Sequence, residues 1–215
     1  MKLEHGTPRE IEGESMRIIG RELEAMGIVL PAGCEAVVKR AIHTTADFDY
    51  ARNLRFTPGA VEAGVAALRA GTALTDTNMA LSGVNRGACE QLGVERFCYM
   101  ADPQVAERAR AERTTRAAAA VDCWASEHPA GIFAVGNAPT ALLRLAECME
   151  AGTLRPALVI GAPVGFVNVV ESKERIWSVC QDLDVPAIVA MGRKGGSTVA
   201  AAVCNALLYQ AAGLR

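Results

Sequence analysis

One of the three histidines in this chain lies in a stretch whose side chains could carry acid–base chemistry. Lys39 and Arg40 precede His43. Two threonines and the carboxylates of Asp47 and Asp49 follow it. Imidazole can give and take a proton near neutral pH, and neighbouring positive charge suits an anionic substrate that must be protonated. The stretch therefore indicates a proton donor for an anionic substrate, and a solvated helix face that happens to carry a histidine would give the same pattern.

Helical spacing sorts this stretch onto two faces. A helix over residues 34–45 places the apolar Val38 and Ile42 on one face, because residues three and four apart are neighbours on a helix. The two cations and the histidine then share the other face. We expect the apolar face to pack on the body of the protein and the histidine to face outward.

Short apolar runs alternate with helical patterns along most of the chain. The predicted strands are residues 73–75, 97–100, 132–135, 157–160 and 187–191. The predicted helices are 8–26, 34–45, 61–70, 103–110, 115–126, 139–151, 172–182 and 197–212. Brief apolar strands are typical of sheets buried on both faces. The alternation predicts an α/β protein with a parallel sheet covered by helices on both sides.

The organisation along the chain favours a single domain over residues 1–215. No internal repeat, low-complexity tract or Pro/Ser-rich linker divides it. A helical region, about residues 8–50, precedes the α/β array and is expected to pack on it. In such folds the ligand site lies outside the carboxyl ends of the strands.

Composition excludes several classes of function. The net charge of −2 gives no reason to expect binding to nucleic acid or to a membrane surface. The longest apolar stretch, residues 157–170, is short for a membrane span and contains Pro163 and Asn168. The seven cysteines include no CxxC pair, so a zinc or iron–sulfur site is not expected. The absence of an apolar signal core at the N-terminus and the odd cysteine count predict a cytoplasmic protein with reduced thiols.

Three loops after predicted strands or at helix starts carry groups that could bind an anion. The loop over 192–197 combines glycines with Arg193 and Lys194, and Ser197 could cap the helix that follows. It matches no nucleotide-phosphate motif, and an ordinary strand-to-helix turn explains it equally well. Asn137 could orient a ligand through its amide. Arg116 opens a predicted helix, where a cation opposes the helix dipole and a partner anion would compensate.

Six motifs together resemble one family, the precorrin-8 methylmutases of cobalamin biosynthesis. They occur in the family's order and cover nearly the whole chain. They are KRAIHTTADFD (39–49), TDTNMALSG (75–83), GNAPTAL (136–142), PVGFV (163–167), ESKE (171–174) and GRKGGS (192–197). The run that begins at His43 looks more like the branch acting on the cobalt-containing substrate than like the metal-free, oxygen-dependent branch.

The resemblance implies a fold, a reaction and an assembly. The fold would be a three-layer αβα, flavodoxin-like arrangement. The reaction would be a 1,5-shift of a methyl group from C-11 to C-12 of a tetrapyrrole, giving cobyrinate, or hydrogenobyrinate in the metal-free branch. The methyl group never leaves the substrate, so no methyl donor or other cofactor is expected, and any cobalt belongs to the substrate. The family forms homodimers with the pocket near the subunit contact.

The resemblance also implies roles for individual residues. His43 matches the family's catalytic histidine, and Ser15 matches a family serine, whereas Met16 stands where the family has an aromatic residue. Because the substrate is a polycarboxylate, a pocket rich in cations makes electrostatic sense. The expected substrate-binding residues are Ser15, Arg17, Arg40, Arg116, Asn137, Lys173, Arg193 and Lys194. No metal ligands are expected.

Two functions of other kinds fit parts of the same sequence. A corrinoid carrier would bind the product without turnover and would not need His43. A flavodoxin-like nucleotide-binding protein would share the fold pattern, but the chain carries no recognisable phosphate motif.

Overall fold

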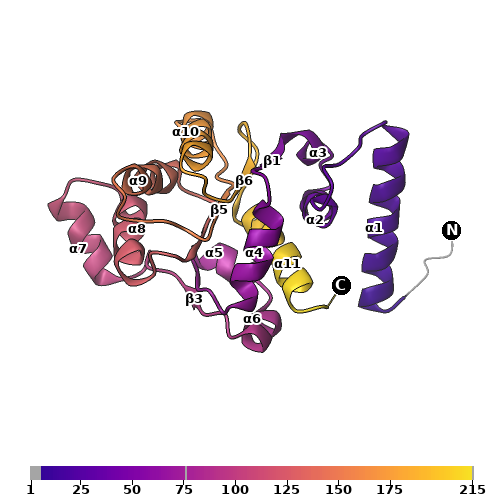
Figure 1. The fold of residues 1–215 in the computed structure, drawn as a ribbon, viewed down its shortest axis with the longest axis horizontal. Helices are drawn as coiled ribbons and strands as arrows, with labels where there is room; N and C mark the ends of the chain where they lie inside the picture. Colours follow the sequence, from indigo (N-terminus) through magenta and orange to yellow (C-terminus); the bar gives the residue numbers. More distant parts are fainter. Residues whose placement is uncertain (1–5, 76, 215) are drawn as a thin grey trace.

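The computed structural model describes residues 6–75 and 77–214; Asp76, in one of the quoted motifs, and the N-terminal residues 1–5 lie outside the described residues. Its centre is a six-stranded sheet in the order β1-β6-β5-β4-β2-β3. Figure 1 shows helices on all sides of it. The strands are β1 (Leu54–Phe56), β2 (Leu74–Thr75), β3 (Arg96–Phe97), β4 (Ile132–Val135), β5 (Leu158–Gly161) and β6 (Ala187–Ala190).

Five of the six strands are parallel, as predicted. Their spatial order β3-β2-β4-β5-β6 is the flavodoxin-like order. β3 is added on one side of β2, and the later strands β4, β5 and β6 are added in turn on the other side. The structure adds β1, which pairs antiparallel with β6 at the sheet edge. The sequence did not predict β1, because this strand is three residues long and carries Arg55 at its centre, so it has no apolar run.

Eleven helices surround the sheet in the described residues. They are α1 (Pro8–Ala25), α2 (Glu35–Thr45), α3 (Tyr50–Asn53), α4 (Ala60–Arg69), α5 (Asn78–Gly83), α6 (Arg86–Leu92), α7 (Pro103–Ala111), α8 (Arg116–Glu127), α9 (Pro139–Glu150), α10 (Val169–Asp182) and α11 (Ser197–Ala211). The eight predicted helices are all present. The additional ones, α3, α5 and α6, are too short to show a helical period.

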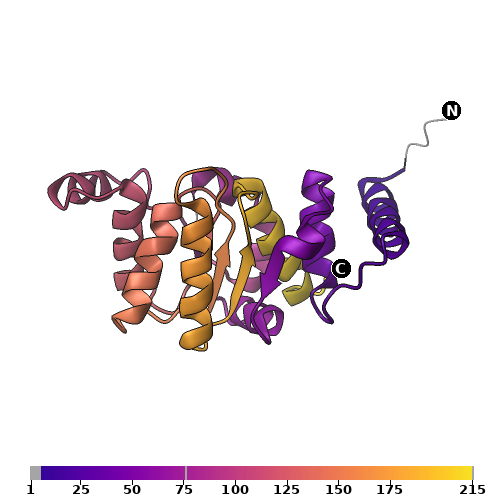
Figure 2. The ribbon, with the colours of Figure 1, turned by 90° about the horizontal axis from the view of Figure 1, so that it is seen from above.

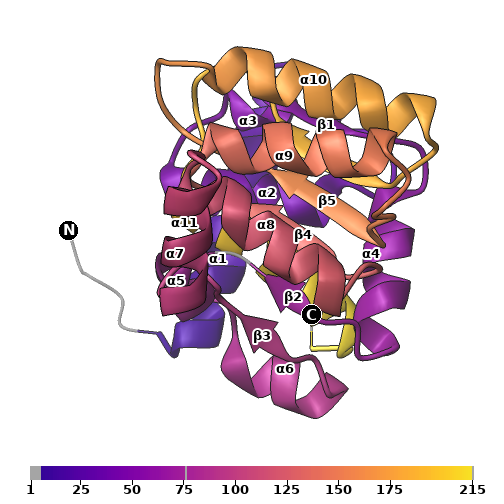
Figure 3. The same ribbon diagram turned by 90° about the vertical axis from the view of Figure 1, so that its left-hand side faces the viewer.

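The helices form two layers because side chains alternate along each strand. Phe133 and Val159 join the core under α8, α9 and α10, which lie side by side over the strands in Figure 3. Ile160 and Ile188 point to the opposite core, under α4 and α11. The parallel sheet is therefore buried on both faces, as the apolar strand sequences predicted.

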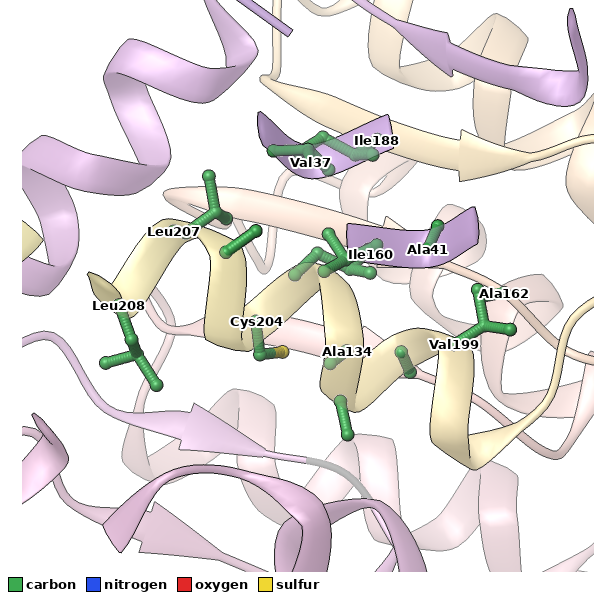
Figure 4. Close-up of a cluster of buried hydrophobic side chains, with 14 of the residues drawn as sticks. Val37, Ala41, Ala134, Ile160, Ala162, Ile188, Val199, Cys204, Leu207 and Leu208 are labelled. Atoms are coloured by element: carbon green, nitrogen blue, oxygen red, sulfur yellow. The ribbon is translucent and has the colours of Figure 1, made fainter. Parts of the chain in front are cut away.

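Helix α11 links the N-terminal helices to the sheet. Ten of its residues are buried, because it lies between the sheet and α2. Figure 4 shows Val37 and Ala41 of α2 in the same cluster as Leu207 of α11 and Ile160 of the sheet. α2 thus packs on the body through its apolar face, as predicted.

Helix α1 is the outermost element. It packs on α2, and Figures 1 and 2 show it at one end of the molecule, with α7 at the opposite end. Its N-terminus is well defined: Thr7 caps it and forms a reciprocal capping box with Glu10. Among the described residues, no helix has the length and apolar character needed to cross a bilayer.

Candidate active site

The loops that follow the parallel strands meet at the carboxyl edge of the sheet, and hydrogen bonds tie three of them together. The hydroxyls of Thr77, after β2, and Ser197, after β6, lie 3.3 Å apart. The amide of Gly196 donates to the carbonyl of Ala162, after β5, at 2.7 Å. The structure therefore assembles residues 77, 162–165 and 192–197 into one surface.

His43 lies at the end of α2, close to this surface. It is exposed in the last turn of the helix, which ends at Ala46 in the left-handed conformation with φ 53°. Partial burial of the imidazole lowers the pKa of His43 below its usual value, and the positive charge of Arg40 lowers the same pKa further. A lowered pKa makes His43 a strong proton donor once it is charged, and leaves it mostly neutral in the free protein at neutral pH.

Arg40, on the same helix face, is held by neighbouring elements. Its guanidinium forms an ion pair with Glu12 of α1 and lies over the ring of Tyr209, 5.2 Å from the centroid. Only 14% of its side chain is exposed, and burial lowers its pKa. The charge of Arg40 is therefore shared with α1 and is not fully available to a ligand.

Lys194 joins the 192–197 loop to the chain that follows His43. Its ammonium donates to the carboxylates of Asp47 and Asp49, both at 2.6 Å. These hydrogen bonds raise the pKa of Lys194 and lower that of Asp47. The contacts confirm that the loop and the His43 stretch are neighbours, but they pair a cation that we expected to be free for the substrate.

The 192–197 loop follows the backbone of residues 162–165 at unusually close range. A Cβ atom on Gly195 would lie 2.3 Å from the carbonyl oxygen of Ala162, so only glycine fits there. Arg193 is exposed, and its guanidinium lies over the exposed ring of Phe166, 5.5 Å from the centroid. The expectation that Ser197 caps α11 is wrong: Gly196 holds the cap position, and no side chain caps the helix.

Lys173 differs most from its predicted role. Its side chain is fully buried, and its ammonium donates to the carbonyls of Gly192 and Lys194, each at 2.8 Å. Burial lowers the pKa of Lys173 to about 8. Direct binding of a substrate carboxylate does not fit this placement, since the ammonium points into the loop and not to solvent.

Arg116 and Asn137 lie together at a second part of the edge. Thr115 caps α8, and its hydroxyl donates to Thr140 at the start of α9, 2.9 Å away. This bond brings the start of α8, with Arg116, next to the loop that contains Asn137. Both side chains are exposed, and Arg116 forms no ion pair within residues 6–75 and 77–214.

The structure places Ser15 and Arg17 apart from the loop residues, on α1. The hydroxyl of Ser15 donates to the carbonyl of Ile11, one turn earlier, at 2.9 Å. Arg17 forms an ion pair with Glu14. A hollow of about 530 Å³ between α1 and α2 is lined by Met16, Lys39 and Arg40, among others.

A small apolar cavity of about 50 Å³ lies between the ends of β2 and β4, where the strand order changes direction across the sheet. Its wall includes Thr77, Tyr99, Trp124, Phe133 and Ala138. Trp124 meets Phe133 edge to face, with ring centroids 5.4 Å apart. The sequence did not predict this cavity, because its aromatic rings come from separate elements and no spacing along the chain relates them.

The described cysteines form no disulfide bonds. All seven are free thiols, and five of them are buried. In the part of the chain that the structure describes, no group of three or more His, Cys, Asp or Glu side chains could hold a metal ion.

Comparison with known proteins identifies the family. The family model of precorrin-8X methylmutase matches residues 10–210. The chain is 44% identical to the cobalt-precorrin-8 methylmutase of Salmonella typhimurium, over 94% of this chain and 95% of that protein. It is 40% identical to the precorrin-8X methylmutase of Pseudomonas aeruginosa, over 90% and 91%. The crystal structure of precorrin-8X methylmutase from Thermus thermophilus superposes with a TM-score of 0.82 at 42% identity, covering 94% of this chain and 98% of that one.

Proposed function

This chain belongs to the precorrin-8X methylmutase family and is an isomerase of cobalamin biosynthesis, and we propose that its substrate is cobalt-precorrin-8. The product would be cobyrinate. The run that begins at His43 supports the cobalt branch. The alternative is the metal-free substrate, with hydrogenobyrinate as product, since relatives with either name are similarly identical.

We propose His43 as the proton donor of the methyl shift. The observation that carries this role is the exposed imidazole at the end of α2, beside the loop surface at the carboxyl edge. Carboxylates of the bound substrate would raise the pKa of His43 and charge it. The imidazolium would donate its proton to the macrocycle and take it back after the shift. The bond from the methyl group to C-11 breaks as its bond to C-12 forms, so no other group is consumed.

The exposed cations would hold the substrate's carboxylates. Arg193 and Arg116 present their guanidinium groups at two parts of the edge, and Asn137 adds an amide beside Arg116. Guanidinium groups bind carboxylates through paired hydrogen bonds, which fix the orientation of a flat ligand. The exposed ring of Phe166 offers a surface for the uncharged parts of the macrocycle.

We also propose a homodimer. Four apolar side chains are exposed on α1 and just after it: Ile11, Ile18, Met26 and Val29. Within its own chain α1 packs mainly on α2, so a second subunit could cover its exposed face. Ser15 and Arg17 of one subunit would then lie near the substrate bound to the other subunit. Light scattering tests the assembly, and a monomer at assay concentration would contradict it.

The reaction requires no methyl donor, and any cobalt enters with the substrate, so we propose an enzyme without a cofactor. We propose a cytoplasmic location, without nucleic acid or membrane partners, on the composition alone.

Visible spectroscopy tests the proposed function, because moving the methyl group brings C-11 into conjugation and changes the chromophore. The purified protein would be incubated separately with cobalt-precorrin-8 and with precorrin-8X. Faster conversion of the cobalt substrate supports the proposal, and faster conversion of the metal-free substrate assigns the other branch. Binding of both without a spectral change would identify a corrinoid carrier.

A further inference from the structure

Lys173 is the one site residue whose placement contradicts a direct role in binding. It extends from α10 and is completely buried, and its ammonium donates to the carbonyls of Gly192 and Lys194. No carboxylate pairs with it among the described residues, and burial alone lowers its pKa. A buried charge without a counter-charge is costly, so a side chain of this kind needs a specific reason to persist.

The two carbonyls that Lys173 binds flank Arg193. Pulling both oxygens toward α10 fixes the turn between them, and the side chain of Arg193 then projects outward over Phe166. Glycines leave this turn flexible unless contacts hold it, and two of them, Gly192 with φ 72° and Gly196 with φ 120°, adopt conformations that favour glycine. Two further bonds hold its other side: Gly196 N–H to the carbonyl of Ala162, and Gly165 N–H to the carbonyl of Arg193.

We propose that Lys173 is a positioning residue that clamps the 192–196 loop, so that Arg193 and Lys194 are held ready for the substrate before it binds. The inference rests on the proposed function, because the clamp matters to catalysis only if this loop binds the substrate. Lys173 itself does not touch the substrate. Its effect on turnover passes through the loop.

The test replaces Lys173 with methionine, which keeps an unbranched chain and removes the donor. The matched control is R175M, which removes an exposed cation from the same helix, where Arg175 pairs with Glu150. Loss of charge-assisted bonds to a preorganised loop should raise KM for cobalt-precorrin-8 by about 10- to 100-fold. kcat should change little, since the loop contributes binding and not proton transfer. R175M should keep the wild-type KM.

A double-mutant cycle with R193A separates positioning from direct contact. If Lys173 acts through the loop, K173M should raise KM much less in the R193A background than in wild type. If the two effects on KM simply add, Lys173 acts independently of Arg193, and the clamp is overturned.

Hydrogen exchange tests the clamp without substrate. The amide of Gly165 donates to the carbonyl of Arg193 in the loop, and the amide of Gly196 in the loop donates to the carbonyl of Ala162. Both amides should exchange at least about tenfold faster in K173M. Unchanged exchange would overturn the proposal. Wild-type protein that turns over neither substrate would refute the proposed function, while the exchange rates would still decide the clamp. Should K173M not fold, K173L, which also lacks the donor, allows the same measurements.

Discussion

The two parts of the carboxyl edge hold their cations in opposite ways. In the first, which we call the held half, Lys173 clamps the 192–196 loop and Lys194 is bound to two carboxylates. In the second, the open half, Arg116 and Asn137 are exposed beside the Thr115–Thr140 bond. The geometry of the held half is set before any ligand binds, but its cations already interact with carbonyls and carboxylates of the protein. The open half keeps its charge free for the substrate.

The largest effect should follow from a change next to the held half. H43A should lower kcat by about 10²- to 10⁴-fold, because it removes the proposed proton donor. Binding of the product should persist, since the cations remain. The measurement is the rate of the spectral change, with H128Q as a control for loss of an imidazole elsewhere. Wild-type turnover by H43A would remove the acid role.

The open half should respond through binding. R116A should raise KM by about 10- to 100-fold with a smaller change in kcat, because a free guanidinium gives its full interaction to a substrate carboxylate. Steady-state kinetics measure this, with R110A, which removes an exposed arginine from α7, as the control. An unchanged KM in R116A would mean that the open half does not contact the substrate.

Removing one carboxylate partner of Lys194 should make the held half resemble the open half. D49N removes one of the two carboxylates that bind Lys194. It keeps the hydrogen bond that the backbone N–H of residue 49 donates to the carboxylate of Asp47. The freed charge should attract the substrate, so KM should fall by about two- to threefold, the size expected of an exposed ion pair. E107Q changes the net charge equally on α7 and should leave KM unaltered. A higher KM in D49N would mean that the pair positions Lys194 for binding.

The smallest effect concerns stability. Keeping the Lys173 ammonium charged in its buried site costs about 3 kcal/mol, from a pKa lowered from 10.5 to about 8. K173M removes this cost and also two hydrogen bonds of similar total size. Its Tm near pH 7 should therefore stay within about 4 °C of wild type, even though substrate binding weakens. A much lower Tm would indicate a purely structural role.

The contribution of Lys173 to the free energy of unfolding depends on pH, and its lowered pKa sets the sign of that dependence. The folded protein loses the Lys173 proton near pH 8, whereas the unfolded chain keeps it to about 10.5. Between these values the unfolded state binds more protons, so this lysine makes the free energy of unfolding rise with pH. Denaturant unfolding across this range should show this contribution as a difference: the free energy of unfolding of wild type should rise relative to that of K173M as the pH increases. Burial raises the pKa of Cys34, Cys89, Cys148 and Cys180, which act in the opposite direction in both proteins.

Sequence patterns predicted the sheet and helices well, because strands buried on both faces and amphipathic helices leave periodic signals. β1 was missed because Arg55 interrupts its three residues. The roles of the site residues stay predictions. Motifs identified the loops, but partners across the fold were invisible: nothing in the spacing showed that Lys194 meets Asp49 or that Lys173 faces carbonyls. The sequence suggested cations free to bind the substrate, but in the fold Arg40, Lys173 and Lys194 bind other groups of the protein.

The central claim is that charged His43 donates a proton during the methyl shift, and the pH profile of kcat/KM tests it most directly. A general acid acts in its protonated form, so kcat/KM should be level at low pH and fall about tenfold per pH unit above the pKa of His43, which lies below its usual value. In kcat the fall should occur at higher pH, because bound substrate carboxylates stabilise the imidazolium. A kcat/KM that rises with pH through this range, or an unchanged profile in H43A, would contradict the account.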